Sequence, residues 1–221
     1  MRWVANGAII SRTHRKQLVV VEEDQMDRKA KPCKDVPCRV ALLHKIYDHV
    51  KGFPLLLEQI QSEGDILTKP VTPERRANAF KTLVATILSI RCRDETAFKV
   101  LEDLWKEYNT PQAFRDIPLE TLELLVRRTG TYKNKAKWIK EIAEILGKEY
   151  HDQVPDTHDA LVQFPGIGDK VANCILVISF GKDVIPVDTH VHRISNRLGW
   201  VTTKKPEATE KALQLALPQS E

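Results

Sequence analysis

The chain has 221 residues, a length that suits one large domain or two small lobes sharing a core and excludes a large multidomain protein. Hydrophobic residues make up 42% and charged residues 29% of the sequence, which favours a globular protein and excludes wholesale disorder. The formal net charge of +4 is compatible with binding to a polyanion but does not by itself identify one.

Four cysteines, at positions 33, 38, 92 and 174, do not form the even framework of a small secreted protein, so we expect a reducing compartment. The first residues lack the apolar core of a signal peptide. The longest apolar run, about 171–180, is too short for a bilayer, which requires about 20 residues. We expect a soluble monomer without membrane contact, in the cytoplasm (associated with the nucleoid) or in the nucleus.

Residues 1–38 form an N-terminal extension whose pattern differs from the rest of the chain. Two short β-branched runs, at 8–10 and 18–21, flank a basic stretch, which permits a small hairpin. Residues 24–38 are charged and end with two closely spaced prolines, a composition typical of a linker. The sequence therefore predicts an extension made of a small hairpin and a linker.

From Val40 onward, apolar residues recur at the three- and four-residue spacing of helices. Helix starts are indicated at Thr72-Pro73, where a Thr N-cap precedes proline, at Asp94, which is expected to cap the next helix, and at Pro118. Further helices are predicted over 132–149, 157–163, 169–180, about 189–198 and about 206–216. These helices follow one another through short connections, so the core is predicted to be all-α.

The segment Phe-Pro-Gly-Ile-Gly-Asp-Lys-Val, residues 164–171, joins two predicted helices through a very short turn. Gly166 and Gly168 allow a positive φ and a close approach by the backbone of a ligand. The helix that follows begins with unpaired N–H groups and the positive end of its dipole, which favour an anion such as a phosphate diester. An ordinary tight turn between two helices explains the same residues equally well.

Asp188 follows the apolar run Ile185-Pro186-Val187 and directly precedes a predicted helix. An aspartate in this place most often serves as the N-cap of the helix. A carboxylate between an apolar segment and a basic edge is also suited to chemistry, because desolvation and nearby charges tune its reactivity. The residues alone leave both roles open for Asp188.

The two segments together resemble a known family. FPGIGDKVAN followed by VDTHVHRISNR is similar to the helix-hairpin-helix DNA glycosylases, and most of all to endonuclease III. In that family the hairpin precedes a Val-Asp-Thr-His motif by one helix, and the interval of 18 residues from Lys170 to Asp188 (188 − 170) agrees with it. The resemblance spans about residues 73–215.

The resemblance implies both a fold and an activity. The fold is the all-α, two-lobed helix-hairpin-helix glycosylase fold, with a helical barrel lobe at 70–183 and a second lobe formed by 39–69 and 184–221. The activity is that of a base-excision repair glycosylase with AP-lyase function. Its expected partner is damaged double-stranded DNA, from which it flips and removes a base, by resemblance an oxidised pyrimidine.

The family's bifunctional members use the hairpin lysine as the nucleophile, so the resemblance implies that Lys170 attacks C1′ of the flipped nucleotide and forms a Schiff base. Asp188 would stabilise the positive charge that develops on the sugar and would assist deprotonation of Lys170. The alternative for Lys170 is a plain phosphate contact, as in non-catalytic hairpins.

The resemblance also implies two loops that fill the space left by the flipped base, here residues 89–94 and 130–135. Arg91 stands where endonuclease III usually has glutamine, and Thr131 where a bulky leucine is common, so the lesion and the opposite base stay open. The residues expected to bind DNA are Gly166, Ile167, Gly168, Arg91, Arg93, Thr131, Tyr132, Lys133, Lys135, His190 and Arg193, with Lys137, Lys170 and His192 completing a basic rim. A solvated basic loop is the alternative for Arg91 and Arg93.

Most members of the family hold a [4Fe–4S] cluster through four closely spaced cysteines near the C-terminus. This sequence has no cysteine after Cys174, and Cys33 and Cys38 do not supply the spacing. We therefore expect that the cluster is absent, or that the sequence ends before it, and we expect no other metal. His190 and His192 fall on opposite sides of a helix, which disfavours a metal-binding pair.

Two alternatives follow from the same residues. A monofunctional glycosylase of this fold, acting on mismatched or alkylated bases, would use Asp188 to activate water. A non-catalytic DNA-binding module would use the hairpin for phosphate contacts alone. The presence of both Lys170 and Asp188 favours the bifunctional enzyme over the non-catalytic module.

Overall fold

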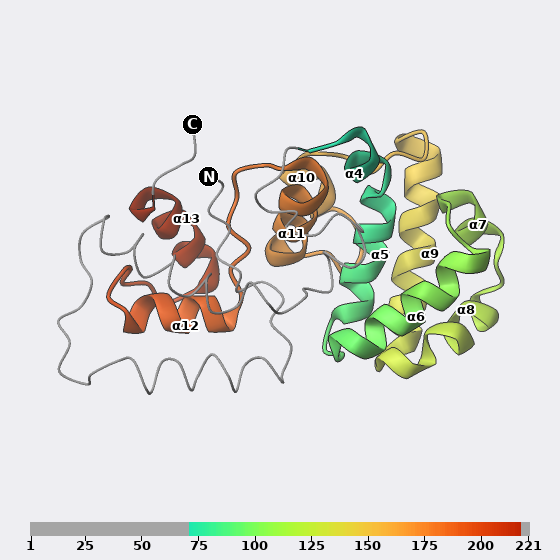
Figure 1. Ribbon diagram of the computed structural model, residues 1–221, viewed down its shortest axis with the longest axis horizontal. Coiled ribbons are helices and arrows are strands. Elements are labelled where there is room, and N and C mark those ends of the chain that lie inside the picture. Colours follow the sequence, from blue (N-terminus) through green and yellow to red (C-terminus); the bar gives the residue numbers. More distant parts are fainter. Residues whose placement is uncertain (1–70, 218–221) are drawn as a thin grey trace. The chain divides into compact units, whose positions relative to one another are not determined.

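The computed structural model of the chain describes residues 71–217, which are helical and contain no strand (Figure 1). The predicted all-α class is confirmed for this part of the chain. The predicted hairpin and linker at 1–38, and the helical pattern that begins at Val40, lie outside the described residues. The described residues fall into two compact units, 71–182 and 183–217. Among them, no helix is long and apolar enough to cross a membrane.

The first unit is built around one central helix, α5 (Figure 1). Its elements are α4 (Pro73–Ala77), α5 (Ala79–Ser89), α6 (Asp94–Glu107), α7 (Pro111–Asp116), α8 (Leu119–Val126), the short 3-10 helix η2 (Arg127–Thr129), α9 (Tyr132–Glu149), α10 (His158–Leu161) and α11 (Asp169–Phe180). α5 contacts α4, α6, α9 and α11, and it is buried along almost its whole length. A helix that is apolar on nearly every face takes such a central position because each face has a neighbour to pack against.

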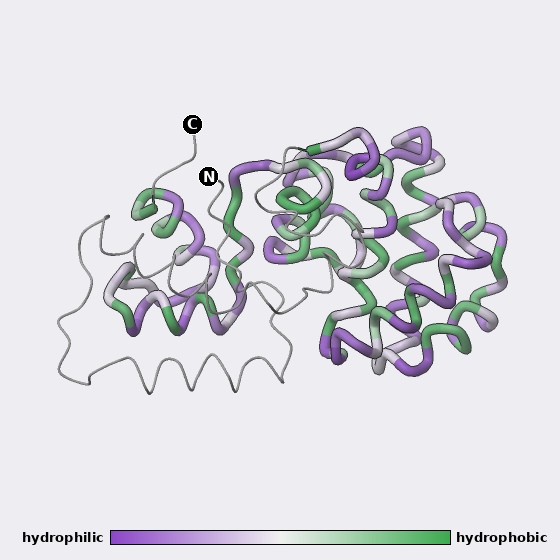
Figure 2. Tube along the Cα trace, viewed as in Figure 1, coloured by the Kyte–Doolittle hydropathy of each residue, from purple (hydrophilic) through white to green (hydrophobic). Residues whose placement is uncertain are grey.

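The helical pattern of the sequence corresponds to the buried faces of the outer helices. In α9, the buried apolar side chains recur every three or four residues, at Ala136, Ile139, Ile142, Ala143 and Leu146. Figure 2 shows the same recurrence of hydrophobic residues between hydrophilic ones along α6, α9 and α12. The predicted bounds of 132–149 for α9 and 169–180 for α11 agree with the structure.

The caps of two helices test the predicted helix starts. Thr72 caps α4 as predicted, because its hydroxyl accepts a hydrogen bond from the backbone N–H of Arg75 at 3.2 Å. The prediction that Asp94 caps α6 is wrong: Arg93 has the extended backbone of the N-cap, with φ −77° and ψ 139°, and Asp94 is the first helical residue. The helix predicted from Thr72 is also interrupted, since Asn78 separates α4 from α5.

Arg75 ties α4 to the end of α11. Its side chain is only 1% exposed, and its guanidinium donates hydrogen bonds to the backbone carbonyls of Val177 and Ile178, with a distance of 3.0 Å from Nε to the Ile178 oxygen. These carbonyls belong to the last turn of α11, where a cation is favoured by the helix dipole and by unsatisfied acceptors. The C-terminal end of α11 is therefore fixed from the interior of the unit.

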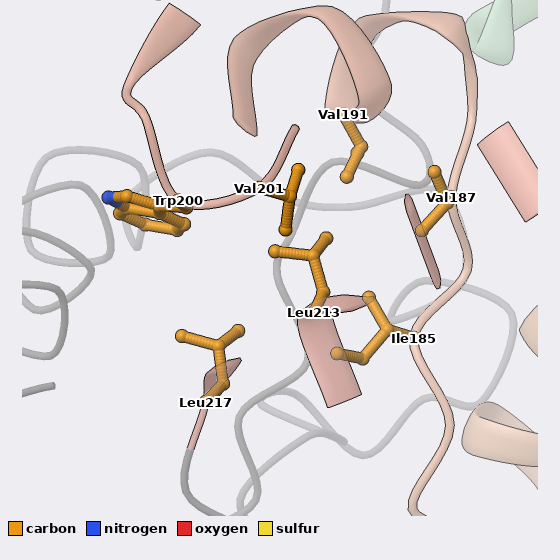
Figure 3. Close-up of a cluster of buried hydrophobic side chains, with 7 residues drawn as sticks. All are labelled: Ile185, Val187, Val191, Trp200, Val201, Leu213 and Leu217. Atoms are coloured by element: carbon orange, nitrogen blue, oxygen red, sulfur yellow. The ribbon is translucent and has the colours of Figure 1, made fainter. Parts of the chain in front are cut away.

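The second unit contains α12 (Thr189–Arg197) and α13 (Pro206–Ala216), as predicted within one residue. Its apolar core gathers side chains from the segment before α12, from both helices and from the turn between them (Figure 3). The residues of this core are Ile185, Val187, Val191, Trp200, Val201, Leu213 and Leu217. Burial of Ile185 and Val187 orients the extended segment that ends at Asp188.

Candidate functional site

The predicted hairpin is present between α10 and α11. Its turn is closed by backbone hydrogen bonds, from the N–H of Phe164 to the Leu161 carbonyl at 3.1 Å and from the N–H of Ile167 to the Phe164 carbonyl at 3.2 Å. Ile167 is 6% exposed and anchors the turn to the interior, while the glycines on either side of it are exposed. The turn therefore presents its backbone outward with few side chains in front of it.

The two glycines of the hairpin have different reasons to be glycine. Gly166 has φ +77°, and a Cβ there would lie 2.5 Å from the indole ring of Trp138, so the protein itself requires glycine at this position. Gly168 has φ −104°, which any residue adopts, and a Cβ there would meet nothing within 4 Å. The open space at Gly168 lies directly before the first turn of α11, where the backbone N–H groups point outward.

Lys170 is the second residue of α11 and is half-buried. Its amine makes no hydrogen bond or ion pair with the described residues. Its neighbour Asp169 is instead paired with His158, at 3.2 Å between Asp169 Oδ1 and His158 Nε2. The carboxylate next to Lys170 is thus directed to the other helix of the hairpin, and the Lys170 amine is left available.

Asp188 is the N-cap of α12, so the capping role is confirmed. Its Oδ1 accepts hydrogen bonds from the backbone N–H groups of His190 and Val191, both at 2.9 Å. Its Oδ2 accepts none from the described residues. One carboxylate oxygen therefore holds the side chain in a fixed orientation, and the other is free to act on a substrate.

Two loops of the first unit carry the residues expected to enter DNA. The Arg91 loop, defined as residues 89–94, runs from the last residue of α5 to the first residue of α6, and the Thr131 loop, residues 130–131, joins η2 to α9. Arg91 has φ 51° and Thr131 has φ 44°, a left-handed conformation that is uncommon for any residue other than glycine and especially for a β-branched one. Both side chains are exposed.

Of the other residues expected to bind DNA in the first unit, Arg93 and Lys133 are exposed and Tyr132 is half-buried. Lys137, a further member of the expected basic rim, is exposed and lies 3.7 Å from a carboxylate oxygen of Glu141. These positions agree with a solvated basic surface and leave Arg93 and Lys133 accessible to a polyanion.

Lys135 does not lie where the sequence interpretation placed it. Its side chain is 0% exposed, and its Nζ donates hydrogen bonds to the Leu88 carbonyl at 2.8 Å and the Thr129 carbonyl at 2.7 Å. Burial lowers the pKa of this amine to about 8. The prediction that Lys135 contacts a DNA phosphate at the surface is therefore wrong. Its spacing to Ile139 and Ile142 on the buried face of α9 was the signal that the prediction missed.

The histidines of the second unit face different surroundings, as expected from their helical spacing. His190 lies near the guanidinium of Arg193, which is exposed, at 3.4 Å. His192 turns inward, where its Nδ1 is 2.6 Å from the hydroxyl of Thr209 and the amide of Asn196 donates to its backbone carbonyl. His192 is therefore part of an internal polar network, and the expected rim keeps only His190 and Arg193 in this unit.

Residues 71–217 contain two cysteines, which by themselves do not supply a four-cysteine cluster. Such a cluster requires four thiolates around one inorganic core. Cys174 is buried within α11, and Cys92 lies half-buried in the Arg91 loop, where burial raises the pKa of its thiol. They lie on different elements of the first unit, and neither forms a disulfide in the part of the chain that the structure describes.

Comparisons with known proteins assign this fold to a family. The profile described as HhH-GPD superfamily base excision DNA repair protein matches residues 84–219. Endonuclease III of Thermotoga maritima is 45% identical over 145 residues, which are 66% of this chain and 68% of the relative. Endonuclease III of Bacillus subtilis is 36% identical over 174 residues, which are 78% of each chain.

Solved structures give the same result. A non-covalent endonuclease III–DNA complex matches with a TM-score of 0.61 and 32% identity, covering 79% of this chain and 78% of that one. A trapped covalent endonuclease III–DNA intermediate matches with a TM-score of 0.62 and 31% identity, at the same coverage. The hairpin and Asp188 both lie inside the matched segment of 84–219. The chain therefore belongs to the HhH-GPD superfamily of base excision DNA repair proteins and is similar to endonuclease III.

Proposed function

We propose that this chain is a DNA glycosylase and AP lyase of the endonuclease III type, which removes damaged bases, chiefly oxidised pyrimidines, from duplex DNA. Membership in the family and the identity to curated endonuclease III proteins support this activity. The observation that carries the proposal is the amine of Lys170 at the start of α11, which has no partner among residues 71–217 and lies two positions after the open Gly168.

Lys170 acts as the nucleophile in this proposal. Its amine forms a bond to C1′ of the flipped nucleotide while the bond from C1′ to the base breaks, and the base leaves with that electron pair and takes up a proton. Opening of the sugar then gives a Schiff base between C1′ and the lysine nitrogen. Removal of a proton from C2′ expels the 3′ phosphate and cleaves the strand.

Asp188 supplies the negative charge that this reaction requires. The sugar gains positive charge as the base departs, and a fixed carboxylate stabilises that charge without having to reorient. The capping hydrogen bonds to Oδ1 fix the carboxylate, and Oδ2 remains to face the sugar or to accept the proton of the Lys170 amine. A monofunctional relative would use the same oxygen to activate water.

DNA is held by backbone and basic groups. The first-turn N–H groups of α11 and the open space at Gly168 suit a phosphate diester of the DNA strand. The residues proposed to contact DNA are Gly166, Gly168, Arg91, Arg93, Thr131, Tyr132, Lys133, His190 and Arg193, with Ile167 anchoring the hairpin from beneath. The protein is proposed to act as a monomer, in the nucleoid or the nucleus.

The proposal includes no iron–sulfur cluster in this chain. Its four cysteines are spread from 33 to 174, a spacing that does not match the closely spaced set of the family. Iron analysis and a visible absorption spectrum of the purified protein test this point. A brown protein with about four iron atoms per chain would contradict it.

Borohydride trapping tests the lyase. A duplex with an oxidised pyrimidine is incubated with wild type, Lys170→Ala and the control Lys148→Ala, whose exposed lysine pairs with Glu144 on α9. Wild type and Lys148→Ala are expected to form a covalent adduct, and Lys170→Ala to form none. Release of the base without any adduct would assign the monofunctional alternative, and binding without release from any lesion would assign the non-catalytic module.

A further inference from the structure

A buried lysine connects the two loops that are proposed to enter DNA, the Arg91 loop and the Thr131 loop. The Nζ of Lys135 donates to the carbonyl of Leu88, the residue before the Arg91 loop, and to that of Thr129, the residue before the Thr131 loop. The two bonds, of 2.8 and 2.7 Å, span 47 and 6 positions of the sequence. One ammonium group thus joins two segments that are otherwise distant in the chain.

The loops that follow these carbonyls both contain a residue in the left-handed region. Such a conformation in Arg91 and Thr131 persists only where the surrounding structure holds it. Lys135 also contacts the Thr131 loop through its backbone, since its N–H donates to the Thr131 carbonyl at 3.3 Å. The left-handed residues are therefore flanked by hydrogen bonds to the same lysine.

Burying the ammonium of Lys135 costs free energy that a side chain with only a packing role would not cost. A buried ammonium loses its hydration, and an apolar side chain of similar length would fill the same space without that cost. The two carbonyls lie at the C-terminal ends of α5 and η2, where a cation is favoured. What lysine adds over methionine is a directional connection between two backbone segments.

We propose that Lys135 is a positioning residue for base flipping, which holds the Arg91 loop and the Thr131 loop at a fixed separation so that both enter the gap left by one flipped base. The inference rests on the proposed function, because it assigns these loops to the same gap. An error of about 1 Å in such a pair costs on the order of 100-fold in rate.

The chain offers a matched control on the same helix. Lys140 also donates two hydrogen bonds to backbone carbonyls, those of Arg115 at 2.8 Å and Ile117 at 2.6 Å. These carbonyls lie in the last turn of α7 and at the residue directly after it, away in sequence from either loop. Lys135→Met and Lys140→Met therefore remove the same chemistry, and only the first removes the connection between the loops.

The experiment compares two reactions of each variant under single turnover. One substrate is a duplex with a paired oxidised pyrimidine, which must be flipped, and the other is a duplex with a preformed abasic site, which lacks the base. Lys135→Met is expected to lose about 100-fold in base excision and under about 5-fold in strand cleavage at the abasic site. Lys140→Met is expected to keep both rates within about 3-fold of wild type.

Equal losses in both reactions, or equal behaviour of the two variants, would overturn the inference, because a general loss of structure affects both substrates alike. Absence of excision by wild type would instead contradict the proposed function. If Lys135→Met does not fold, Lys135→Gln, which keeps a donor, replaces it. Failure of both variants to fold where Lys140→Met folds would assign Lys135 to stability alone and refute the positioning role.

Hydrogen exchange of the free protein gives a readout that does not depend on activity. In Lys135→Met, the amides of residues 89–94 and 130–131 are expected to exchange about 10-fold faster than in wild type, with the amides of α7 unchanged. In Lys140→Met, the amides of α7 are expected to exchange faster and those of residues 89–94 and 130–131 to stay unchanged. Unchanged exchange in both loops of Lys135→Met would count against a role for Lys135 in fixing them.

Discussion

At the scale of single residues, the two hairpin glycines differ in role: the fold requires Gly166, whereas Gly168 is proposed to admit the DNA backbone. Gly166 is held by its positive φ and by the ring of Trp138, whereas Gly168 has neither constraint. Asp188 combines both roles in one side chain, because Oδ1 caps α12 and Oδ2 accepts no hydrogen bond from residues 71–217. Conservative substitutions at these positions can therefore separate stability from activity.

Gly166→Ala is expected to lower the stability of the protein, and Gly168→Ala is expected to lower its affinity for DNA. Alanine at 166 meets the Trp138 ring and a positive φ, so unfolding free energy should fall by about 2–4 kcal/mol. Alanine at 168 should change it by less than about 1 kcal/mol, the cost of a poorer N-cap. Binding to duplex DNA should nevertheless weaken roughly 10-fold for Gly168→Ala, about 1.4 kcal/mol. Urea unfolding and DNA titration measure the two quantities, and unchanged affinity would show that no phosphate approaches position 168.

Asp188→Asn and Asp188→Ala separate the charge of Asp188 from its cap. Asparagine is as good an N-cap as aspartate, so its unfolding free energy should stay within about 0.5 kcal/mol of wild type, while alanine should lose about 1 kcal/mol. Both variants should lose at least about 100-fold in single-turnover excision, because both lack the negative charge. Near-normal excision by Asp188→Asn would mean that the carboxylate only caps α12.

Lys135 also predicts a dependence of stability on pH. Burial lowers its pKa from 10.5 to about 8, so between these values the unfolded chain holds more protons than the folded one. This contribution to stability is present above pH 10.5 and is lost as the pH falls through about 8. The unfolding free energy of wild type relative to Lys135→Met should thus rise by roughly 1–3 kcal/mol from pH 7 to pH 10.

The nearby thiol of Cys92 is the titrating group that interacts with Lys135, so both proteins are best compared in a Cys92→Ser background. Urea unfolding at several pH values gives the difference directly. A flat difference across this range would show that the Lys135 amine keeps an ordinary pKa in the folded protein.

At the scale of elements, α11 connects the hairpin to the core. Its first turn presents Lys170, and every residue from Ala172 to Phe180 is buried. Its last turn is bound by the guanidinium of Arg75. A helix fixed at its far end and buried along its length places Lys170 with little freedom, which suits a nucleophile that must meet one carbon atom.

Arg75→Leu should therefore destabilise the whole first unit. The change removes the buried guanidinium donor from the Ile178 carbonyl, while the Val177 carbonyl keeps the N–H of Gly181, and it should lower the unfolding free energy by about 3–5 kcal/mol. Lys106→Ala is the control, because its pair with Asp103 is exposed at 72% and 68% of the side chains and should contribute less than about 1 kcal/mol. A loss below about 1 kcal/mol for Arg75→Leu would show that water replaces the guanidinium.

The sequence pattern predicted most of these elements because their apolar residues follow the helical period. The bounds of α9, α11 and α13 agree with the prediction, and the cap at Thr72 follows from its chemistry. The interruption at Asn78 and the cap at Arg93 depend on local backbone angles that residue types do not specify. The charge of Lys135 predicts a surface residue, whereas its position on the buried face of α9 agrees with the observed burial.

At the scale of the whole molecule, the structure shows which positive residues behind the net charge of +4 are exposed. Arg91 and Arg93 on the Arg91 loop and Lys133 in the first turn of α9 are exposed in the first unit, and Arg193 is exposed in the middle of α12 in the second. Lys135 carries charge as well, but it lies in the interior, where its ammonium is bonded to two backbone carbonyls. Only exposed charges release counterions from DNA, so the surface total is the quantity that governs binding.

The salt dependence of binding to undamaged duplex DNA distinguishes an exposed lysine such as Lys133 from the buried Lys135. Each phosphate contact contributes about 0.9 to the slope of log affinity against log salt concentration. Lys133→Met should therefore reduce that slope by about 1, whereas Lys135→Met should leave it unchanged, because its ammonium contacts no phosphate. Fluorescence anisotropy at several salt concentrations measures both slopes. A reduced slope for Lys135→Met would mean that this side chain leaves the interior when DNA binds, and an unchanged slope for Lys133→Met would remove Lys133 from the DNA-binding surface.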